Sequence, residues 1–538
     1  MVPPLRVLPR QLTRFKPRLI PTYGIPCQRA FTKSRNRSQQ KLEEHVISPR
    51  SNGQDKQDES FKWKEIFGKL LETSLTTFAS IAILGSAGYF YHRYYKKVVL
   101  EKMENAFEAG YSSLELAALA RHEAEADLFW IPRTEQEQID AIVQGNRKGH
   151  YHLIVGEKGV GKTSLILQAM KRIHGDGIAM FDAHGDLEIF RLRLGKALDF
   201  EFNEDYIGSF FSIKGQRDTT ALLDIERAFN KLEKVALKRR EIVRRPLVLI
   251  INNSHLIRDD EDGQDLLELI QQRAEIWAAS GLVTVVLNSD DYWVYERLKQ
   301  NSTRMQVVSV GDIGPARVFE SLKTYRKKIF GEDIEQSVLK EVYDKIGGRL
   351  NFLSQVAMSE NMLRSCDHIC KREKTWFLNK CWILGEPLDP HVEEQQTYCA
   401  AAMVLAKALV DKEKEMLARG DASLPQIPLH KAREIITRAD FMQNYDHINI
   451  FAIDSDAMVR ADSVPMMNAF RDVCTAEGFE DHLQATLDRL DAIESLQRTR
   501  ELTLKDLQQG LEYLAVQRGL SGRVEQTTTL SAMETKEK

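Results

Sequence analysis

The sequence has few cysteines, six among 538 residues. That number is too small for a disulfide framework in a chain of this length, and no two cysteines form a CxxC pair. Cys366 and Cys370 flank His368, but a zinc site needs four ligands and no second pair lies nearby. We therefore expect reduced thiols on helix faces. The sequence also lacks an HExxH motif, which excludes the common zinc metalloprotease signature.

A large excess of charge of either sign is also missing. The chain has 75 basic and 78 acidic residues, a net charge of −3, so it is not a polycation. Hydrophobic residues make up 43% and charged residues 28%, which is ordinary for a globular protein and too apolar for a chain disordered throughout. Its length predicts about three folded units with extensions.

Acidic residues are absent from the first 41 positions, which hold ten Lys or Arg with Ser, Thr and Pro scattered among them. This composition is typical of a mitochondrial transit peptide. The stretch Arg29–Ser34 resembles a matrix-processing site, so we predict a transit peptide over residues 1–31. The alternative is a basic arm that binds nucleic acid or lipid. Residues 32–72 are polar and mixed in charge and are expected to form a tether.

One uncharged run of 19 residues follows, over 73–91. As a helix it could just span a bilayer, and aromatic residues lie near both ends. We predict a single transmembrane helix in the mitochondrial inner membrane, with protein partners there. The alternative is a buried helix of a soluble domain, because the run contains Thr, Ser and Gly. Basic residues on both flanks leave the orientation open. Residues 98–129 are expected to form a helical connector.

A phosphate-binding motif lies between a predicted strand at 151–155 and a predicted helix. Residues 156–164 read GEKGVGKTS and meet the GxxxxGK[ST] spacing. Backbone N–H groups of such a loop converge on phosphate oxygens, Lys162 can reach the β and γ phosphates, and the Thr163 hydroxyl can ligate Mg²⁺. The predicted cofactors are therefore ATP and Mg²⁺. The predicted binding residues are Gly156, Glu157, Lys158, Gly159, Val160, Gly161, Lys162, Thr163 and Ser164.

Two amides stand where such a site needs two acids. The predicted strand at 245–251 is followed by Asn252 and Asn253. An active ATPase would have an Asp holding Mg²⁺ through water at the first position and a Glu polarising the attacking water at the second. An amide can hydrogen-bond a metal-bound water, but it cannot accept a proton as a carboxylate does. We expect binding to survive better than hydrolysis. The neighbouring carboxylates that could compensate are Asp182, Asp186, Asp259 and Asp260.

With further strands expected at 177–181, 282–287 and 305–310, and helices from 315 to 372, residues 130–370 resemble the AAA+ ATPases, closest to the initiator-like and STAND-like branch. The resemblance implies a five-stranded parallel sheet over 130–312, a helical lid over 313–372, and assembly with other copies of the chain. It matches Asn288 to sensor 1, Arg349 to sensor 2 of the lid, and Arg304 to an arginine finger or to an arginine that leads into a strand. Each of the three could instead be a surface or fold-supporting residue.

The order helix, helix, hairpin, helix over 428–500 predicts a winged helix after a helical linker at 373–427. It resembles the winged-helix domain that follows the AAA+ core in fungal, mainly mitochondrial, proteins. This region has eight basic and thirteen acidic residues, so we expect protein docking or lid bracing in preference to DNA contact. Lys431, Arg433 and Arg438 form the candidate basic patch. Residues 501–538 are expected to be helical and then disordered.

The predicted fold class is α/β: a P-loop NTPase sheet with a helical lid and an α+β winged helix, preceded by one transmembrane helix. We favour a membrane-anchored mitochondrial ATP-binding protein that acts as a nucleotide-gated scaffold or assembly factor, with weak or absent hydrolysis because of Asn252 and Asn253. One alternative is an active ATPase that remodels proteins at the inner membrane. The other is a tether for mitochondrial DNA, which the net charge of −5 over 428–500 disfavours.

Overall fold

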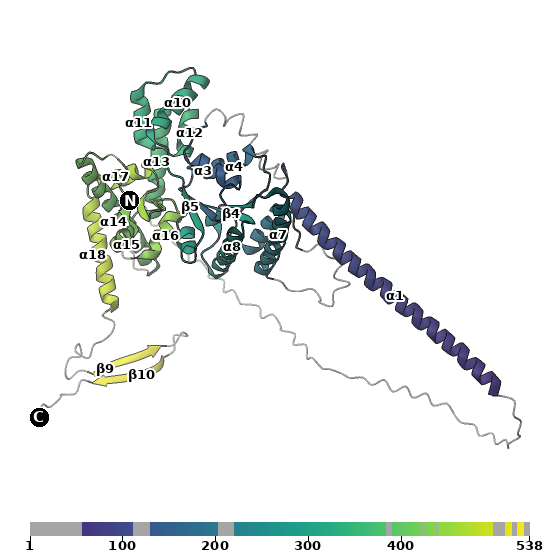
Figure 1. Cartoon of the computed structure of the whole chain (residues 1–538). Coiled ribbons are helices and arrows are strands. Elements are labelled where there is room, and N and C mark those ends of the chain that lie inside the picture. The colour runs from purple at the N-terminus through teal and green to yellow at the C-terminus, as the bar shows by residue number, and fades with distance from the viewer. Residues whose placement is uncertain are drawn as a thin grey trace, which may run out of the picture. The chain divides into compact units, whose positions relative to one another are not determined.

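The structure is a computed structural model, shown in Figure 1. It describes residues 56–110, 130–202, 220–383, 390–421, 423–436, 438–498, 512–518 and 524–531. The predicted transit peptide and most of the predicted connector lie outside the described residues. The chain divides into two units, residues 1–81 and 82–538, and the boundary falls inside helix α1 (Lys56–Asn105).

Helix α1 contains the whole uncharged run at 73–91. Across the described residues, no helix combines the length and the apolar character needed to cross a membrane. The predicted transmembrane helix is therefore not supported. The physical reason lies in the composition of the run, because its Thr, Ser and Gly residues dilute the aliphatic ones and lower the mean hydropathy.

A five-stranded parallel sheet forms the centre of the second unit, as predicted. Its strand order is β2-β3-β4-β1-β5. The strands are β1 (Tyr151–Val155), β2 (Ile178–Asp182), β3 (Leu247–Asn252), β4 (Val283–Ser289) and β5 (Met305–Ser309). The helices around the sheet are α3 (Glu135–Val143), α4 (Lys162–Arg172), α5 (Leu187–Ala197), α7 (Ala221–Val243), α8 (Glu261–Ser280) and α9 (Trp293–Lys299).

Helices cover both faces of this sheet (Figure 1). Alternate strand residues such as Leu153 and Leu249 pack with α5, α7 and α8. Their neighbours Ile154 and Ile250 pack on the other face with α3 and α4. Burial on both faces explains why the strands read as continuous apolar runs and not as alternating patterns. Because the strands are parallel, their carboxyl ends and the polar residues that follow them meet at one edge.

The lid consists of four helices with a core of its own. They are α10 (Pro315–Ile329), α11 (Gln336–Ile346), α12 (Leu350–Met358) and α13 (Met362–Cys381). The turn between α11 and α12 touches the segment that follows β5. A Cβ atom on Gly348 would lie 2.0 Å from the carbonyl oxygen of Ile313, so glycine is required for this close approach.

The winged helix follows, built around an aromatic cluster that includes Tyr445, Phe451 and Phe470. Its three-stranded antiparallel sheet has the order β6-β8-β7. The strands are β6 (Ile427–Pro428), β7 (Phe451–Ile453) and β8 (Met458–Ala461). The helices are α14 (Pro390–Ala418), α15 (Leu429–Ile436), α16 (Ala439–His447), α17 (Val464–Cys474) and α18 (Phe479–Arg498).

Two predictions about the C-terminal third are corrected. Helix α14, predicted as part of a linker, buries Ala402, Leu405 and Leu409 in the winged-helix core. The tail, predicted to be helical and then disordered, contains an antiparallel pair of strands, β9 (Glu512–Arg518) and β10 (Val524–Ser531). Aromatic and β-branched residues, including three consecutive threonines at 527–529, favour strands there.

Candidate nucleotide-binding site

The glycine-rich loop connects the end of β1 to the start of α4, as the motif predicts. Gly159 and Gly161 have φ values of 83° and 100°, a region that glycine occupies without strain. A Cβ atom on Gly161 would lie 2.7 Å from the side chain of Leu350 in the lid. The first N–H groups of α4 have no partner within the helix and point toward the loop. This arrangement is a cradle for an anion.

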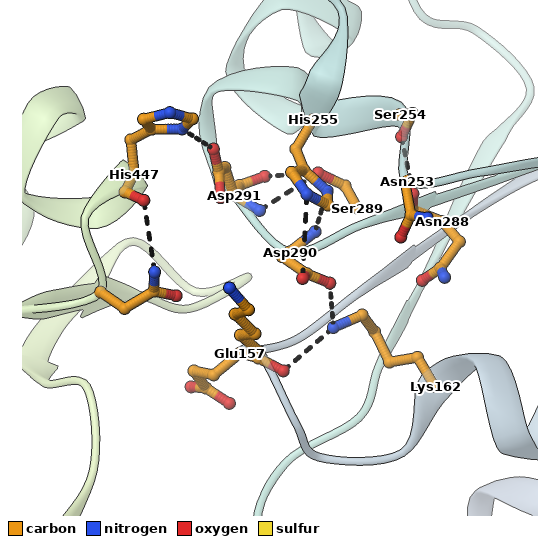
Figure 2. Close-up of polar contacts among 12 residues, drawn as sticks. Glu157, Lys162, Asn253, Ser254, His255, Asn288, Ser289, Asp290, Asp291 and His447 are labelled. Carbon is orange, nitrogen blue, oxygen red and sulfur yellow. Dashed lines mark hydrogen bonds and ion pairs between the residues drawn. The ribbon is translucent and has the colours of Figure 1, made fainter. Parts of the chain in front are cut away.

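Lys162 is almost completely buried, with 4% of its side chain exposed. Its Nζ atom donates to the carbonyl oxygens of Gly156 at 2.7 Å and Glu157 at 3.0 Å. It also forms an ion pair with Asp290 Oδ1 at 2.7 Å. Figure 2 shows Lys162 pointing toward both Asp290 and Glu157. A phosphate group that binds Lys162 must therefore compete with the carboxylate of Asp290.

His255 supports Asp290 from the other side (Figure 2). The Nδ1 atom of His255 accepts a hydrogen bond from the backbone N–H of Asp290 at 3.2 Å. In a neutral ring the proton must then be on Nε2, which lies 3.9 Å from Asp290 Oδ2. Neither residue was predicted as part of the site. Their only sequence signal is that both follow the carboxyl ends of central strands, β3 and β4.

Three predicted site residues come together beside the loop. Asn252 Oδ1 accepts hydrogen bonds from Thr163 Oγ1 at 3.2 Å and from Asn288 Nδ2 at 2.5 Å. Asn288 Nδ2 also lies 3.3 Å from Thr163 Oγ1. Among the described residues, the buried Oδ1 atom of Asn288 has no hydrogen-bond partner. A buried acceptor without a hydrogen-bond partner costs free energy in the folded state. The unpartnered Asn288 Oδ1 therefore indicates a ligand or water that completes this cluster.

Asp182, the last residue of β2, is paired with both amides of the degenerate motif. Its Oδ1 atom accepts from Asn252 Nδ2 at 2.6 Å and from Asn253 Nδ2 at 3.0 Å. Asn253 has a φ of 52°, a left-handed conformation that Asn tolerates better than most residues. Of the four carboxylates considered from the sequence, Asp182 is the one hydrogen-bonded to Asn252 and Asn253 in the described structure.

The other three carboxylates have structural roles. Asp186 and Asp260 cap the N-termini of α5 and α8, where their side chains accept backbone hydrogen bonds. Asp259 accepts hydrogen bonds from the side chains of Gln264 and Gln443. Their positions give no support for a role in replacing the acids missing from β3.

Arg349, the predicted sensor 2, connects three parts of the chain. Its side chain is 2% exposed. Its Nε atom pairs with Asp312 Oδ1 at 2.8 Å, and its Nη1 atom donates to the carbonyl oxygen of Lys158 in the glycine-rich loop at 2.9 Å. Nη1 also pairs with Asp462 Oδ2, just after β8 of the winged helix, at 3.2 Å. The guanidinium group therefore joins the lid, the loop and the winged helix.

A second ion pair connects the loop to the winged helix. Arg460 on β8 pairs with Oε1 of the buried Glu157. Among the described residues, Glu157 Oε2 is buried without a partner. A cavity of about 570 Å³ lies beside this pair, and its lining includes Asp290, Asp312 and Asp454. The cavity beside the glycine-rich loop is therefore bounded on one side by the winged helix.

A third contact lies at the end of β4. His447 Nδ1 is 2.9 Å from Asp291 Oδ2. Figure 2 shows these two side chains in contact. The backbone N–H of Tyr292 donates to Asp446 Oδ2 at 2.8 Å. These contacts join the residues next to Asp290 directly to helix α16. Sequence reasoning missed all the contacts of the winged helix with the site, because they depend on how two separate domains dock.

Arg304 lies at the opposite edge of the sheet, just before β5. Its Nη1 atom is 3.5 Å from the carbonyl oxygen of Gly149, and its own carbonyl accepts from the N–H of Tyr151. The structure therefore does not bring Arg304 to the glycine-rich loop of the same chain. This position agrees with an arginine that leads into a strand.

The matches to known families follow the division of the chain into a domain with the parallel sheet and a winged helix. Residues 132–285 match the model of the AAA ATPase domain, and residues 379–494 match the model of the fungal AAA protein C-terminal winged helix domain. The chain combines an AAA ATPase domain with the winged helix domain of fungal AAA proteins. The winged helix domain begins within the region predicted as a linker, which agrees with the packing of α14 in its core.

Several solved structures are similar to the chain at low identity, and no curated protein matches its sequence. A Walker-type ATPase of Pyrococcus abyssi has 13% identity and a TM-score of 0.41, with 64% of this chain and 96% of that chain covered. Cdc6p from Pyrobaculum aerophilum has 11% identity and a TM-score of 0.29, covering 65% and 97%. The replication initiator DnaA, bound to AMPPCP and single-stranded DNA, has 10% identity and a TM-score of 0.29, covering 68% and 95%.

The residues of the AAA domain fit ATP and Mg²⁺. The loop offers N–H groups and Lys162 to phosphates, and Thr163 offers a hydroxyl to the metal ion. Among the described residues, the buried Oδ1 of Asn288 has no hydrogen-bond partner, so the polar cluster lacks one donor. When bound, Mg²⁺ would neutralise charge on the phosphate oxygens. The deviation from the family pattern is the lack of carboxylates at the end of β3, where Asn252 is the last residue and Asn253 follows it.

The contact between the AAA domain and the winged helix domain should depend on pH. Burial raises the pKa of Asp462 to about 6 from an ordinary value of 3.8, although Arg349 opposes this shift. Because the folded-state pKa is the higher one, the stabilisation from Asp462 is complete below about pH 3.8 and is lost as the pH rises through about 6. The full difference is about 3 kcal/mol. The free energy of unfolding, measured from pH 4 to 8, should fall by about this amount relative to an Asp462→Asn variant. A pH-independent difference would contradict this expectation.

Proposed function

We propose that this protein binds ATP with Mg²⁺ and that the bound nucleotide controls how the winged helix domain docks on the AAA domain. One observation carries the proposal. Both predicted site cations at the glycine-rich loop, Lys162 and Arg349, are held by carboxylates, and one of these carboxylates, Asp462, belongs to the winged helix domain. A nucleotide that attracts these cations weakens the contact, so binding shifts the population toward an undocked winged helix.

In this proposal the protein is a nucleotide-gated scaffold or assembly factor with slow hydrolysis. The amides of Asn252 and Asn253 cannot accept a proton from an attacking water as a carboxylate can. A conformation set by bound ATP would therefore persist. Assembly with other copies belongs to the same proposal and is supported by the AAA domain match. An active ATPase is the second candidate, because Asp182 lies beside both amides.

The proposed coupling can be tested by hydrogen exchange in the full-length protein. We expect ATP with Mg²⁺ to speed exchange of the β8 amides, Met458–Ala461, because the ion pairs next to them are released. The helices of the winged-helix core, such as α17, should keep their exchange rates. Exchange in β8 that is unchanged at saturating ATP would contradict the coupling, and absence of ATP binding would contradict the proposal as a whole.

We also propose that the protein acts in mitochondria. The support is the acid-free, basic composition of residues 1–41. Imaging of the full chain with a C-terminal fluorescent tag, compared with a chain that lacks residues 1–31, distinguishes a targeting segment from a basic arm.

Binding of DNA by the winged helix domain is disfavoured by the structure as well as by charge. All three members of the candidate basic patch are paired with carboxylates. Lys431 pairs with Glu434 at 2.9 Å, and Arg438 pairs with Asp440 at 2.8 Å. Arg433 pairs with Glu296 of the AAA domain at 3.1 Å. Phosphate binding would have to displace these partners on a domain that is acidic overall.

A further inference from the structure

We propose that Asp182 is a positioning residue that replaces the missing acid of β3 by orienting and polarising Asn252. The inference rests on the proposed binding of ATP with Mg²⁺. In this arrangement the carboxylate lies on β2 and the amide on β3 transmits its effect to the metal side of the site. The two residues are direct neighbours, since β2 and β3 are parallel and Asp182 is in register with Asn252.

The orientation of the Asn252 amide follows from the chemistry of its partners. An ionised carboxylate only accepts hydrogen bonds, so the amide must turn Nδ2 toward Asp182, at 2.6 Å. Its Oδ1 atom then faces Thr163 and Asn288. An amide oxygen can accept from a metal-bound water, whereas an amide NH₂ group can only repel the ion. Asp182 therefore fixes the amide orientation in which Asn252 presents its Oδ1 atom to the metal side of the site.

The charge of Asp182 adds to this effect. Hydrogen bonds to a charged group are shorter and stronger than neutral ones. The same Oδ1 atom accepts from Asn252 and Asn253, so both amides are held by one anion. Withdrawing electron density from the NH₂ group makes the Asn252 oxygen a better acceptor. Asp182 is exposed while Asn252 is 4% exposed, which places the charge in water and the neutral amide inside.

The unpartnered Asn288 Oδ1 is a second, independent indication that a ligand or water completes this cluster. The Nδ2 group of Asn288 donates to Thr163 and to Asn252, and Asn252 is the residue that Asp182 orients. The side chains of Asn252 and Asn288 thus converge on the Thr163 hydroxyl with a fixed pattern of donors and acceptors. Without Asp182, the Asn252 amide could turn over, and its NH₂ group would then face Asn288 and Thr163.

The test compares ATP affinity with Mg²⁺ and with EDTA in the full-length protein. For Asp182→Asn we expect about a tenfold loss of the affinity gained from Mg²⁺, because a charge-assisted hydrogen bond becomes a neutral one. Affinity in EDTA should not change. The exchanged pair, Asp182→Asn with Asn252→Asp, returns the carboxylate to β3 and should restore the gain. Asp186→Asn is the matched control, because it removes a charge from the same loop while Asn still caps α5.

The outcomes separate the two proposals. Loss of the Mg²⁺ gain in Asp182→Asn, with recovery in the exchanged pair, would support the positioning role. A full Mg²⁺ gain in Asp182→Asn, while the unmodified protein binds ATP, would overturn this inference alone. Loss without recovery in the exchanged pair would also overturn it, because a nonspecific structural effect is not repaired by moving the charge. Failure of the unmodified protein to bind ATP would overturn the proposed function and this inference with it.

Discussion

Replacing Lys162 with Ala should lower the affinity for ATP with Mg²⁺ about a hundredfold, which corresponds to about 2.8 kcal/mol. Lys162 is the one side-chain ammonium group buried at the glycine-rich loop within the described residues, and it is satisfied by Gly156, Glu157 and Asp290. A phosphate that reaches the loop in the variant would meet the Asp290 carboxylate with no cation between them. Isothermal titration calorimetry on the full-length protein measures the change.

Two further variants are measured in the same way, one as a control and one to test the competing carboxylate. Lys158→Ala removes a charge from the same loop, but its side chain is exposed, so the affinity should change little. Asp290→Asn removes the carboxylate that competes with phosphate for Lys162, so ATP should bind more tightly than to the unmodified protein. If Lys162→Ala bound ATP as well as the unmodified protein does, the proposed site would be wrong.

Replacing Arg349 with Ala should reduce the free energy of unfolding by about 3–5 kcal/mol, the usual effect of removing one partner of a buried ion pair. The variant would leave the carboxylates of Asp312 and Asp462 without their shared cation. It would also leave the carbonyl oxygen of Lys158 without the donor it has now. Chemical denaturation monitored by circular dichroism measures the loss.

The comparison variants for Arg349 separate charge from geometry. Arg349→Lys keeps the charge but has a single ammonium group, which cannot reach three acceptors from three segments, so it should fall between Ala and the unmodified protein. Arg364→Ala, on the exposed face of α13, should lie within about 0.5 kcal/mol of the unmodified protein. A loss below about 1 kcal/mol for Arg349→Ala would show that the winged helix domain is held mainly by other contacts.

Local patterns in the sequence were sufficient for the parts of the fold that depend on neighbouring residues. The glycine-rich loop lies between β1 and α4 as its spacing predicts, because glycine backbone freedom and strand and helix propensities act over a few residues. The apolar runs correspond to the five strands of the parallel sheet. The coarse family resemblance, an AAA core followed by a winged helix, is confirmed by the family models.

The predictions that the structure does not support depend on context. Residues 73–91 lack charge, but a bilayer span also needs sufficient mean hydropathy, which the Thr, Ser and Gly residues reduce. Helix α14 was interpreted as a linker because its apolar residues carry no sign of what they pack against. The tail is predicted to be helical and then disordered, whereas its strands pair with one another. Pairing is a property of two segments and not of either one alone.

The glycine-rich motif alone predicts a phosphate-binding loop with Lys162 and Thr163, and the residues after the predicted strand show two amides where acids are expected. The contacts of these residues depend on the tertiary structure. Asp290 holds Lys162, Asp182 orients Asn252, and Asp462 of the winged helix domain holds Arg349. Each of these pairs joins residues that are far apart in the chain. The attraction within each pair acts only after packing of the apolar core has brought the strand ends and the two domains together. Local sequence patterns therefore do not predict these contacts.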